Sequence, residues 1–347
     1  MRRKKTLLFG LALFVLFCGS GLGQEFPYPV AKIWDASPHN AFTDLLYFQD
    51  AFYCTFREST GHVPGPATGV GDGTVRVLRS EDGENWESVT LLAVPTYDLR
   101  DAKLSVTPDG RLMVLMGGSV CINGSWRSRL PHVAFSENGR EFSQPVPLRV
   151  DPEIKSDVDW IWRVTWRENV GYGVLYQDLS QSQTEWQAFL VKTTNGIDYE
   201  KVSKLNVTGL PNEATARFDA KGNMTIFIRR EGDDTIAKLG CSASPYTDWK
   251  WHDVGVRIGG PNLIYLSDDS VILGGRVDGL TKIGTLTDDF KYRNLWVLPS
   301  GGDCSYPGFC VHNDKLWISW YSSHEGHASI YITSIPLADV KKAIATP

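Results

Sequence analysis

The sequence of 347 residues predicts an all-β protein, a six-bladed β-propeller of four-stranded antiparallel blades. Three observations predict this fold. A turn motif recurs at a fixed period, six hairpins of alternating apolar residues follow one another, and no segment longer than a turn shows a helical period. The 33 glycines and 12 tryptophans agree with many turns and an aromatic-rich framework, and a hydrophobic content of 42% excludes a disordered or fibrous chain.

The recurring turn motif reads Ser or Thr, one residue, Asp or Asn, Gly, two residues, and an aromatic residue. It begins at Ser80, Ser136 and Thr193, so its copies lie 56 and 57 residues apart. The Asp or Asn side chain can accept hydrogen bonds from its own turn, and glycine adopts positive φ without strain. The motif joins the third and fourth strands of a unit, so we expect it to be structural and to lie on the face opposite the functional one.

The predicted hairpins form the first two strands of each unit. They are Leu45–Phe56, Ala102–Met116, Val164–Tyr176, Ala214–Ile228, Leu263–Gly274 and Gly308–Tyr321. A third strand follows each hairpin: Thr74–Leu78, Pro131–Phe135, Gln187–Val191, Ile236–Cys241, Thr281–Leu286 and Ser329–Thr333. Five units continue into a fourth strand. Since the chain ends before the sixth unit gains one, we expect the N-terminal strand Val30–Trp34 to complete that blade and close the ring.

The first residues are expected to lie outside the propeller. Residues 1–23 resemble a secretory signal, with four basic residues before the apolar run Leu7–Phe17, which is short for a membrane span. Residues 24–347 then form a single propeller domain. We expect an exported protein, secreted or periplasmic, without stable membrane insertion. A lipid anchor at Cys18 is disfavoured because Phe17 stands where such signals have a small residue.

Composition excludes several functional classes. The chain has 35 Lys and Arg against 40 Asp and Glu, a net charge of −5, so it lacks the excess of basic residues typical of nucleic-acid binding. It contains no CxxC pair and no HExxH motif, so a metal site of the familiar spacings is not expected. No cofactor is predicted.

Charged residues gather where the loops of one predicted face meet the strand ends. The first five units each place an arginine near the axis there, and several guanidinium groups in one place repel each other unless an anion or carboxylates lie among them. We therefore predict a pocket for an anionic ligand. The candidate binding residues are Arg57, Arg100, Asp101, Arg163, Arg229, Arg230, Arg276, His324 and Glu325.

Tyr306 and Glu213 are the candidate catalytic pair on this face. Tyr306 follows Asp303 at the start of an innermost strand, and Glu213 starts the innermost strand of unit four. A phenol whose pKa is lowered by nearby arginines can act as a nucleophile once a carboxylate takes its proton. The structural alternatives are a core tyrosine and a glutamate paired with one of the arginines.

These segments resemble the sialidase superfamily. The turn motif is similar to the Asp box of that family, one residue shorter than its usual form. The stretch from Asn212 to Arg229 is similar to the segment that carries the catalytic glutamate, Glu213 here, and a substrate-binding arginine, Arg229. The stretch Ser305–Phe309 looks like the tyrosine nucleophile segment, and Arg276 stands where a third carboxylate-binding arginine belongs.

The sequence departs from the family at two places. The stretch Ala41–Asp44 has no arginine where the family usually has one, so Arg57 or Arg100 would have to complete the clamp. The loop Ser59–Gly73 offers Asp72 or His62 as the general acid. The resemblance thus implies an exo-acting glycoside hydrolase that removes a terminal anionic sugar, sialic acid or a related 2-keto acid, from a glycan.

Two other functions remain open. In the first, the same scaffold is a hydrolase or lyase for uronic or sulfated polysaccharides, with Tyr306 and the histidines His62, His132 and His324 as acid and base. In the second, the propeller binds carbohydrate without catalysis. In either case Trp160, Trp162 and Trp166 could stack on sugar rings or simply pack between units.

Overall fold

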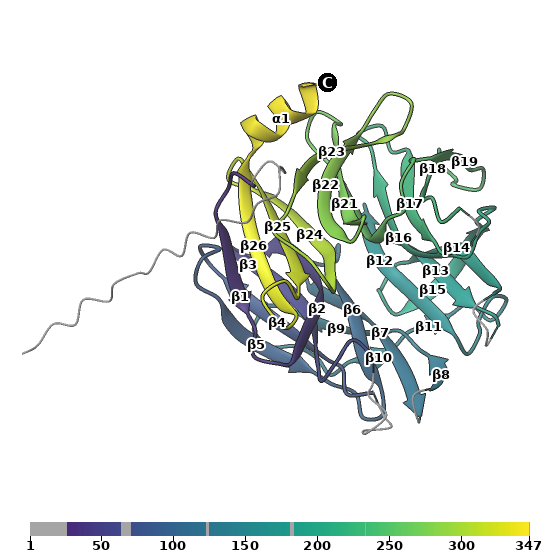
Figure 1. The fold of residues 1–347 in the computed structure, drawn as a ribbon. Coiled ribbons are helices and arrows are strands. Elements are labelled where there is room, and N and C mark those ends of the chain that lie inside the picture. Colours follow the sequence, from purple (N-terminus) through teal and green to yellow (C-terminus); the bar gives the residue numbers. More distant parts are fainter. Residues whose placement is uncertain (1–25, 64–70, 123–124, 181–183, 233, 347) are drawn as a thin grey trace, which may run out of the picture.

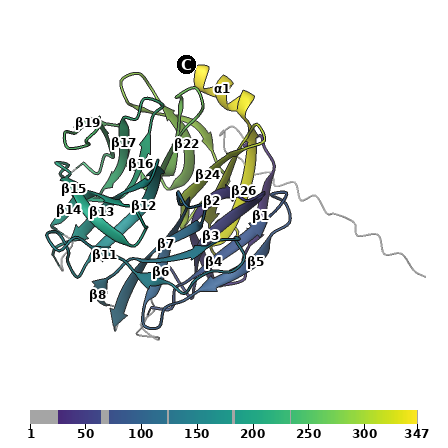
Figure 2. The ribbon, with the colours of Figure 1, turned by 180° about the vertical axis from the view of Figure 1, so that it is seen from behind.

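The computed structural model describes residues 26–63, 71–122, 125–180, 184–232 and 234–346, so the predicted signal at residues 1–23 lies outside the described residues. The described chain forms six sheets arranged as a ring around a central axis (Figures 1 and 2), which confirms the predicted six-bladed propeller. In the described segments, no helix is long and apolar enough to cross a membrane.

Within each blade the strands follow one another from the axis outward. Blade one contains β2 (His39–Phe48), β3 (Ala51–Ser59), β4 (Thr74–Ser80) and β5 (Glu87–Leu92). Blade two contains β6 (Asp98–Val106), β7 (Leu112–Ile122), β9 (His132–Ser136) and the short β10 (Val146–Pro147), with β8 (Ser125–Arg129) paired to β7. Blade three contains β12 (Asp159–Arg167), β13 (Val170–Asp178), β14 (Trp186–Thr193) and β15 (Asp198–Lys204), and β11 (Arg149–Val150) lies beside β15.

The last three blades are four-stranded. Blade four contains β16 (Pro211–Phe218), β17 (Met224–Arg230), β18 (Lys238–Ser242) and β19 (Lys250–Asp253). Blade five contains β20 (Gly259–Tyr265), β21 (Val271–Val277), β22 (Leu280–Leu286) and β23 (Tyr292–Val297). Blade six contains β24 (Cys304–His312), β25 (Lys315–Ser322), β26 (Ser329–Pro336) and the N-terminal β1 (Val30–Trp34).

The ring is closed by β1, as predicted. It pairs antiparallel with β26, with Val30 opposite Thr333 and Lys32 opposite Tyr331, so the purple and yellow ends of the chain lie side by side in Figure 1. The Thr333 hydroxyl also donates to the Pro29 carbonyl at 2.7 Å. One blade therefore draws on both ends of the described chain, which removes the open edge that an incomplete ring would leave.

The three copies of the turn motif have the expected geometry. In the first copy the amides of Glu84 and Asn85 donate to Asp82 Oδ1 at 2.8 Å, and the amide of Gly83 donates to Ser80 Oγ at 2.8 Å. The motif glycines Gly83, Gly139 and Gly196 all have positive φ. Each motif joins the third and fourth strands of its blade, so the structural role predicted for it is confirmed.

Every innermost strand carries one extra residue at the same height, and the sequence does not show this feature. The register shifts lie at residues 41–44, 100–103, 161–164, 211–214, 259–262 and 305–308 of β2, β6, β12, β16, β20 and β24. A β-bulge bends its strand and redirects a side chain. Four of the six bulges hold a residue at positive φ: Phe42, Asp101, Gly260 and Tyr306.

The prediction that no segment is helical is wrong for the C-terminus. Helix α1 (Leu337–Ala345) follows β26 directly. Its apolar residues Leu337, Val340 and Ile344 pack with the core of blade six, and Val340 is fully buried. The helix has only nine residues and three apolar residues on one face, so the sequence shows too few helical repeats to distinguish it from a turn.

We expect the contact between the second turn motif and strand β3 of the neighbouring blade to contribute measurably to stability. A Cβ at Gly139 would lie 1.9 Å from the hydroxyl of Tyr53 in blade one, whereas a Cβ at Gly110 would meet nothing within 4 Å. Both glycines have positive φ, so both Ala variants carry a backbone cost of about 1–2 kcal/mol. Gly139→Ala should lose roughly 1–3 kcal/mol more than Gly110→Ala, because the buried Tyr53 must move. Urea unfolding of the two variants measures this difference, and equal losses would contradict it.

Candidate active site

A pocket of about 250 Å³ opens where the six bulges meet the axis. Its lining comes mainly from the first three blades and from the two innermost strands of the others. The lining residues are Phe42, His62, Val63, Arg100, Asp101, Ser119, Arg129, Trp160, Tyr176, Trp186, Glu213, Arg229, Arg276 and Tyr306. Seven residues predicted from the sequence are among them: His62, Arg100, Asp101, Glu213, Arg229, Arg276 and Tyr306.

Tyr306 and Glu213 are in direct contact. The Tyr306 hydroxyl donates to Glu213 Oε1 at 2.6 Å. Arg229 Nη1 lies 2.9 Å from the same carboxylate oxygen and 3.3 Å from the Tyr306 hydroxyl. The other carboxylate oxygen of Glu213 accepts the amide of Gly260 at 2.8 Å. A phenol, a carboxylate and a guanidinium thus share one hydrogen-bonded contact that is largely shielded from solvent.

The protonation states of this pair follow from its surroundings. Burial disfavours the charge on Glu213, but Arg229 and the hydrogen bonds from Tyr306 and Gly260 outweigh it, so the pKa of Glu213 lies below its ordinary value. Burial and the adjacent Glu213 carboxylate raise the pKa of Tyr306 well above its ordinary value. Arg229 lowers the pKa of this phenol, as expected, but burial and Glu213 outweigh it, so the expected net lowering is wrong in the free protein. The resting pair is a neutral phenol beside a carboxylate.

Neighbouring blades hold Tyr306 in place. A side chain at position 260 would collide with its ring, since a Cβ there would lie 2.5 Å from the ring carbons, so Gly260 leaves the space that Tyr306 occupies. The rings of Phe42 and Trp162 lie 4.9 and 5.6 Å from it. The carbonyl of Tyr306, freed from its own sheet by the bulge, accepts the Thr43 hydroxyl at 2.8 Å.

Three of the predicted arginines line the pocket. Arg229 contacts the catalytic pair, Arg276 lies 3.7 Å from Asp303, and Arg100 donates to Asp98 and to the His62 carbonyl. Their guanidinium groups reach the pocket from three different blades. One side of the pocket is therefore positively charged, although the three arginines lie far apart in the sequence.

The other three predicted arginines are held elsewhere. Arg57 is fully buried and forms a two-pronged ion pair with Asp98 at 2.6 and 3.0 Å. Arg163 pairs with the buried Asp44 at 2.7 Å. Arg230 points to the opposite side of β17 from Arg229 and bonds to Asp234 and to two carbonyls. None of the three lines the pocket, because each buried side chain is committed to partners elsewhere.

Three further predicted residues also lie away from the pocket lining. Asp72 accepts the Thr60 amide at 2.9 Å in the loop after β3. His324 contacts Ser322 at 2.9 Å, and Glu325 accepts the Tyr331 hydroxyl at 3.0 Å on the outer part of blade six. These positions leave Asp72 without contact to the catalytic pair, so it is poorly placed to be the acid that the family resemblance implied.

The pocket has an aromatic wall that the sequence analysis only partly anticipated. Trp186 stacks on Tyr176 with ring centroids 5.6 Å apart. Arg129 lies over both Trp160 and Trp186, at 5.9 and 5.6 Å. Trp160 is one of the three tryptophans that the sequence offers for stacking on a sugar ring. Trp162 instead packs beneath Lys103 at 4.5 Å. Only strand pairing across blades two and three brings Arg129, Tyr176 and Trp186 to one wall.

Asp101 is a second carboxyl group of the pocket. Its bulge position gives it a φ of 55°. Burial raises its pKa, and nearby Glu213 adds to the effect, while Lys103 and Arg100 oppose it. Among the residues that the structure describes, no hydrogen bond or ion pair to its carboxylate is found. The group is therefore available to a ligand.

Asp303 joins two histidines beside the pocket. Its Oδ2 lies 2.8 Å from His39 Nε2 and 2.7 Å from His62 Nδ1, and its Oδ1 accepts the Tyr321 hydroxyl at 2.8 Å. The three ligand-type atoms lie within 4.8 Å of one another, a spacing that a metal ion could bridge. However, the carboxylate already faces three hydrogen-bonding groups and the Arg276 guanidinium. The cluster is therefore arranged as a hydrogen-bond network.

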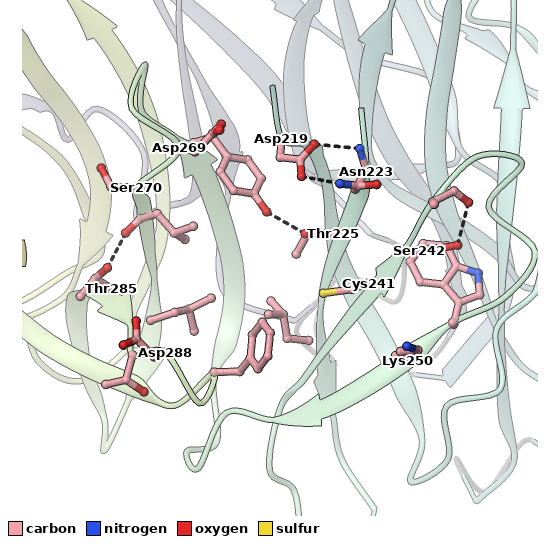
Figure 3. A pocket seen from close by; sticks show the side chains of 18 of the residues that line it. Asp219, Asn223, Thr225, Cys241, Ser242, Lys250, Asp269, Ser270, Thr285 and Asp288 are labelled. Atoms are coloured by element: carbon pink, nitrogen blue, oxygen red, sulfur yellow. Dashed lines mark hydrogen bonds between the residues drawn. The ribbon is translucent and has the colours of Figure 1, made fainter. Parts of the chain in front are cut away.

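A larger hollow lies elsewhere, and its acidic side chains do not gather around one point. A groove of about 980 Å³ between blades four and five is lined by the turns of the face opposite the pocket. Figure 3 shows that Asp219 there is held by Asn223 of its own turn, and that Thr225 is hydrogen-bonded. The labelled acidic residues point in different directions along the groove. The smaller pocket at the axis is the candidate active site, because a phenol, a carboxylate and a guanidinium are in mutual contact there.

Comparison with known proteins agrees with the fold. No family model matches the sequence, and no curated protein matches it either. A protein of unknown function from Dyadobacter fermentans is similar in structure, with a TM-score of 0.76 and 18% identity over 88% of this chain and 97% of that one. An α-L-arabinofuranosidase of Fusarium graminearum bound to an iminosugar inhibitor has a TM-score of 0.68 and 13% identity, with coverage of 90% and 98%.

A sialidase of Trypanosoma rangeli in complex with the inhibitor DANA is also similar, with a TM-score of 0.65 and 12% identity. The match covers 88% of this chain but 56% of the sialidase chain. At these identities the comparisons show a shared fold. The protein is a six-bladed propeller that resembles the structures of sialidases and arabinofuranosidases.

We expect Arg230 to contribute to stability rather than to the pocket. Arg230→Met should lower the free energy of unfolding by roughly 2–4 kcal/mol, because Asp234 and the carbonyls of Thr208 and Ile236 lose a buried donor. The matched change Arg257→Met removes an exposed ion pair with Glu231 and should cost less than about 1 kcal/mol. Thermal unfolding compares the two, and an undiminished stability of Arg230→Met would contradict this assignment.

Proposed function

We propose that this protein is an exo-acting glycoside hydrolase of the sialidase type, which removes a terminal anionic sugar from a glycan. One observation carries the proposal: the Tyr306 hydroxyl is hydrogen-bonded to Glu213 at 2.6 Å while Arg229 contacts both. A neutral phenol with an adjacent base is a nucleophile that becomes charged only during attack. Such a nucleophile suits a negatively charged sugar, which a permanent carboxylate nucleophile would repel.

The proposed first step forms one bond, breaks one bond and moves two protons. Glu213 Oε1 takes the hydroxyl proton of Tyr306 while the phenolate oxygen attacks the anomeric carbon. Because Arg229 lies 2.9 Å from Glu213 and 3.3 Å from the phenol oxygen, it favours a negative charge on either group. The bond to the leaving oxygen breaks at the same time, and that oxygen takes a proton from an acid of the pocket. Water then releases the sugar by the reverse proton movements.

The cationic side of the pocket supports an anionic substrate. Arg229 and Arg276 are the two arginines that the family resemblance assigns to the sugar carboxylate, and Arg100 adds a third guanidinium. Phe42 occupies the bulge where the family usually has an arginine, so the clamp differs from that of a sialidase. A uronic acid or a sulfated sugar has a negative group in another position and is therefore a second substrate class for the same machinery.

A neutral pentofuranoside is a further candidate substrate. The Fusarium protein of similar fold is an α-L-arabinofuranosidase. In this chain, Phe42 and the aromatic wall of Trp160, Tyr176 and Trp186 offer apolar faces on which a sugar ring can stack. A carbohydrate-binding propeller without catalysis would share this wall but would not need the contact between Tyr306 and Glu213.

Fluorogenic substrates test the proposal directly. We expect the wild-type protein to release 4-methylumbelliferone from the α-sialoside or the β-glucuronide, and Tyr306→Phe to lose roughly 10³-fold or more in kcat because the attacking oxygen is gone. The phenylalanine ring preserves the packing against Phe42. The matched variant Tyr265→Phe removes a hydroxyl in the distant groove, where it contacts Thr225, and should keep full activity.

The outcomes separate the candidate functions. Turnover of the α-L-arabinofuranoside alone would move the proposal to neutral furanosides. No turnover of any glycoside, together with unchanged sugar binding by Tyr306→Phe in calorimetry, would exclude a hydrolase and favour the binding module.

The acid side of the pH profile should depend on Arg229. Glu213 must be ionised to accept the proton, and its lowered pKa keeps kcat/KM high at pH values below the ordinary pKa of a glutamate. In Arg229→Gln the burial of Glu213 is no longer offset, so its pKa rises and the acid limb moves to higher pH. Arg276→Gln reduces activity but should leave the limb in place. Profiles of kcat/KM against pH test this, and a limb that does not move in Arg229→Gln would contradict it.

A further inference from the structure

The loop after β3 presents His62 at the edge of the pocket in a fixed orientation. The Nδ1 edge of its ring faces Asp303 Oδ2 at 2.7 Å, and the ring packs edge-on to Phe42 at 5.3 Å. Its carbonyl accepts Arg100 Nη2 at 2.7 Å, which ties the loop to blade two. The side chain is 47% exposed and lines the pocket.

Asp303 determines which nitrogen carries a proton in the resting ring. Burial disfavours its charge, but the groups around it, His39, His62 and Tyr321, hold the pKa of Asp303 far below its ordinary value. An ionised carboxylate can only accept hydrogen bonds. His62 Nδ1 must therefore donate, and Nε2 is the nitrogen that remains to exchange a proton with a ligand.

We propose that His62 is the general acid of the reaction, with Asp303 as the positioning residue that holds its ring. This inference rests on the proposed function and completes it, because that mechanism leaves the acid unnamed. A histidine here takes the part that the family resemblance gave to an aspartate. Asp72, the other candidate in the same loop, bonds to Thr60 and does not line the pocket.

The proton balance closes over the two steps. In the first step the doubly protonated ring of His62 gives its Nε2 proton to the glycosidic oxygen as the bond between carbon and that oxygen breaks. Tyr306 forms its bond to the anomeric carbon and its proton moves to Glu213. In the second step water attacks that carbon and gives a proton to His62 Nε2. The phenolate leaves and takes its proton back from Glu213.

Leaving-group dependence tests this assignment. The substrates are the 2,4-dinitrophenyl and methyl glycosides of the sugar that the wild-type protein cleaves in the fluorogenic panel. His62→Gln should lose about 10²–10⁴-fold in kcat/KM on the methyl glycoside, which needs protonation, and less than about 10-fold on the dinitrophenyl glycoside, which does not. Added imidazole should restore part of the loss in His62→Gly. Asp303→Asn should show the same selectivity for the activated substrate, which a merely structural role would not produce.

Asp101 is the matched comparison, since it is the other carboxyl group that lines the pocket besides Glu213. Asp101→Asn should reduce both substrates to a similar degree. If the loss of activity in Asp101→Asn depends on the leaving group and the loss in His62→Gln does not, Asp101 is the acid and the proposal is overturned. If chelation abolishes wild-type activity and added Zn²⁺ restores it, His39, His62 and Asp303 bind a metal and the proposal is also overturned. A wild-type protein that cleaves no glycoside would instead contradict the proposed function itself.

Discussion

The extra residue in each innermost strand is the constraint on which the pocket depends. A regular strand alternates its side chains between two faces, and both faces of a propeller blade are covered by neighbouring blades. The bulge breaks this alternation at one height and aims Phe42, Asp101, Glu213 and Tyr306 at the axis. Carbonyls freed at these points are bonded across blades, since Asn262 donates to Pro307 and Thr215 donates to Pro261. The same irregularity therefore forms the site and joins the blades.

Charge beneath the pocket follows from the same geometry. Lys103 comes directly after a bulge, is fully enclosed, and has its pKa lowered to about 8, chiefly by burial and then by Arg163. Asp44, which pairs with Arg163 and accepts the Leu104 amide, partly offsets this lowering of the Lys103 pKa. Burying several charges costs free energy unless each finds a partner. The arginines that line the pocket are those for which a partner leaves part of the guanidinium exposed, as in Arg229 and Arg276.

The sequence predicts the fold far better than it predicts the site. Repeats, alternation and the missing fourth strand fix the number of blades and the closure by β1, because these depend on local patterns. Tyr306, Glu213 and Arg229 could be found from motif spacing. The choice among arginines could not, since the carboxylates that hold Arg57 and Arg163 away from the pocket, Asp98 and Asp44, lie far from them along the chain. Arg129, Trp186 and Asp303 acquire their roles only through strand pairing.

The departure at Phe42 connects the fold to substrate choice. Its ring lies 4.9 Å from Tyr306 and 5.3 Å from His62, so it packs between the nucleophile and the predicted acid. Phe42 adds no charge beside the three guanidinium groups of Arg100, Arg229 and Arg276 that line the pocket. Asp303 Oδ2 meanwhile holds His39 and His62. One aromatic side chain at the bulge of β2 therefore contacts both the proposed nucleophile and the proposed acid without taking up the carboxylate that orients the acid.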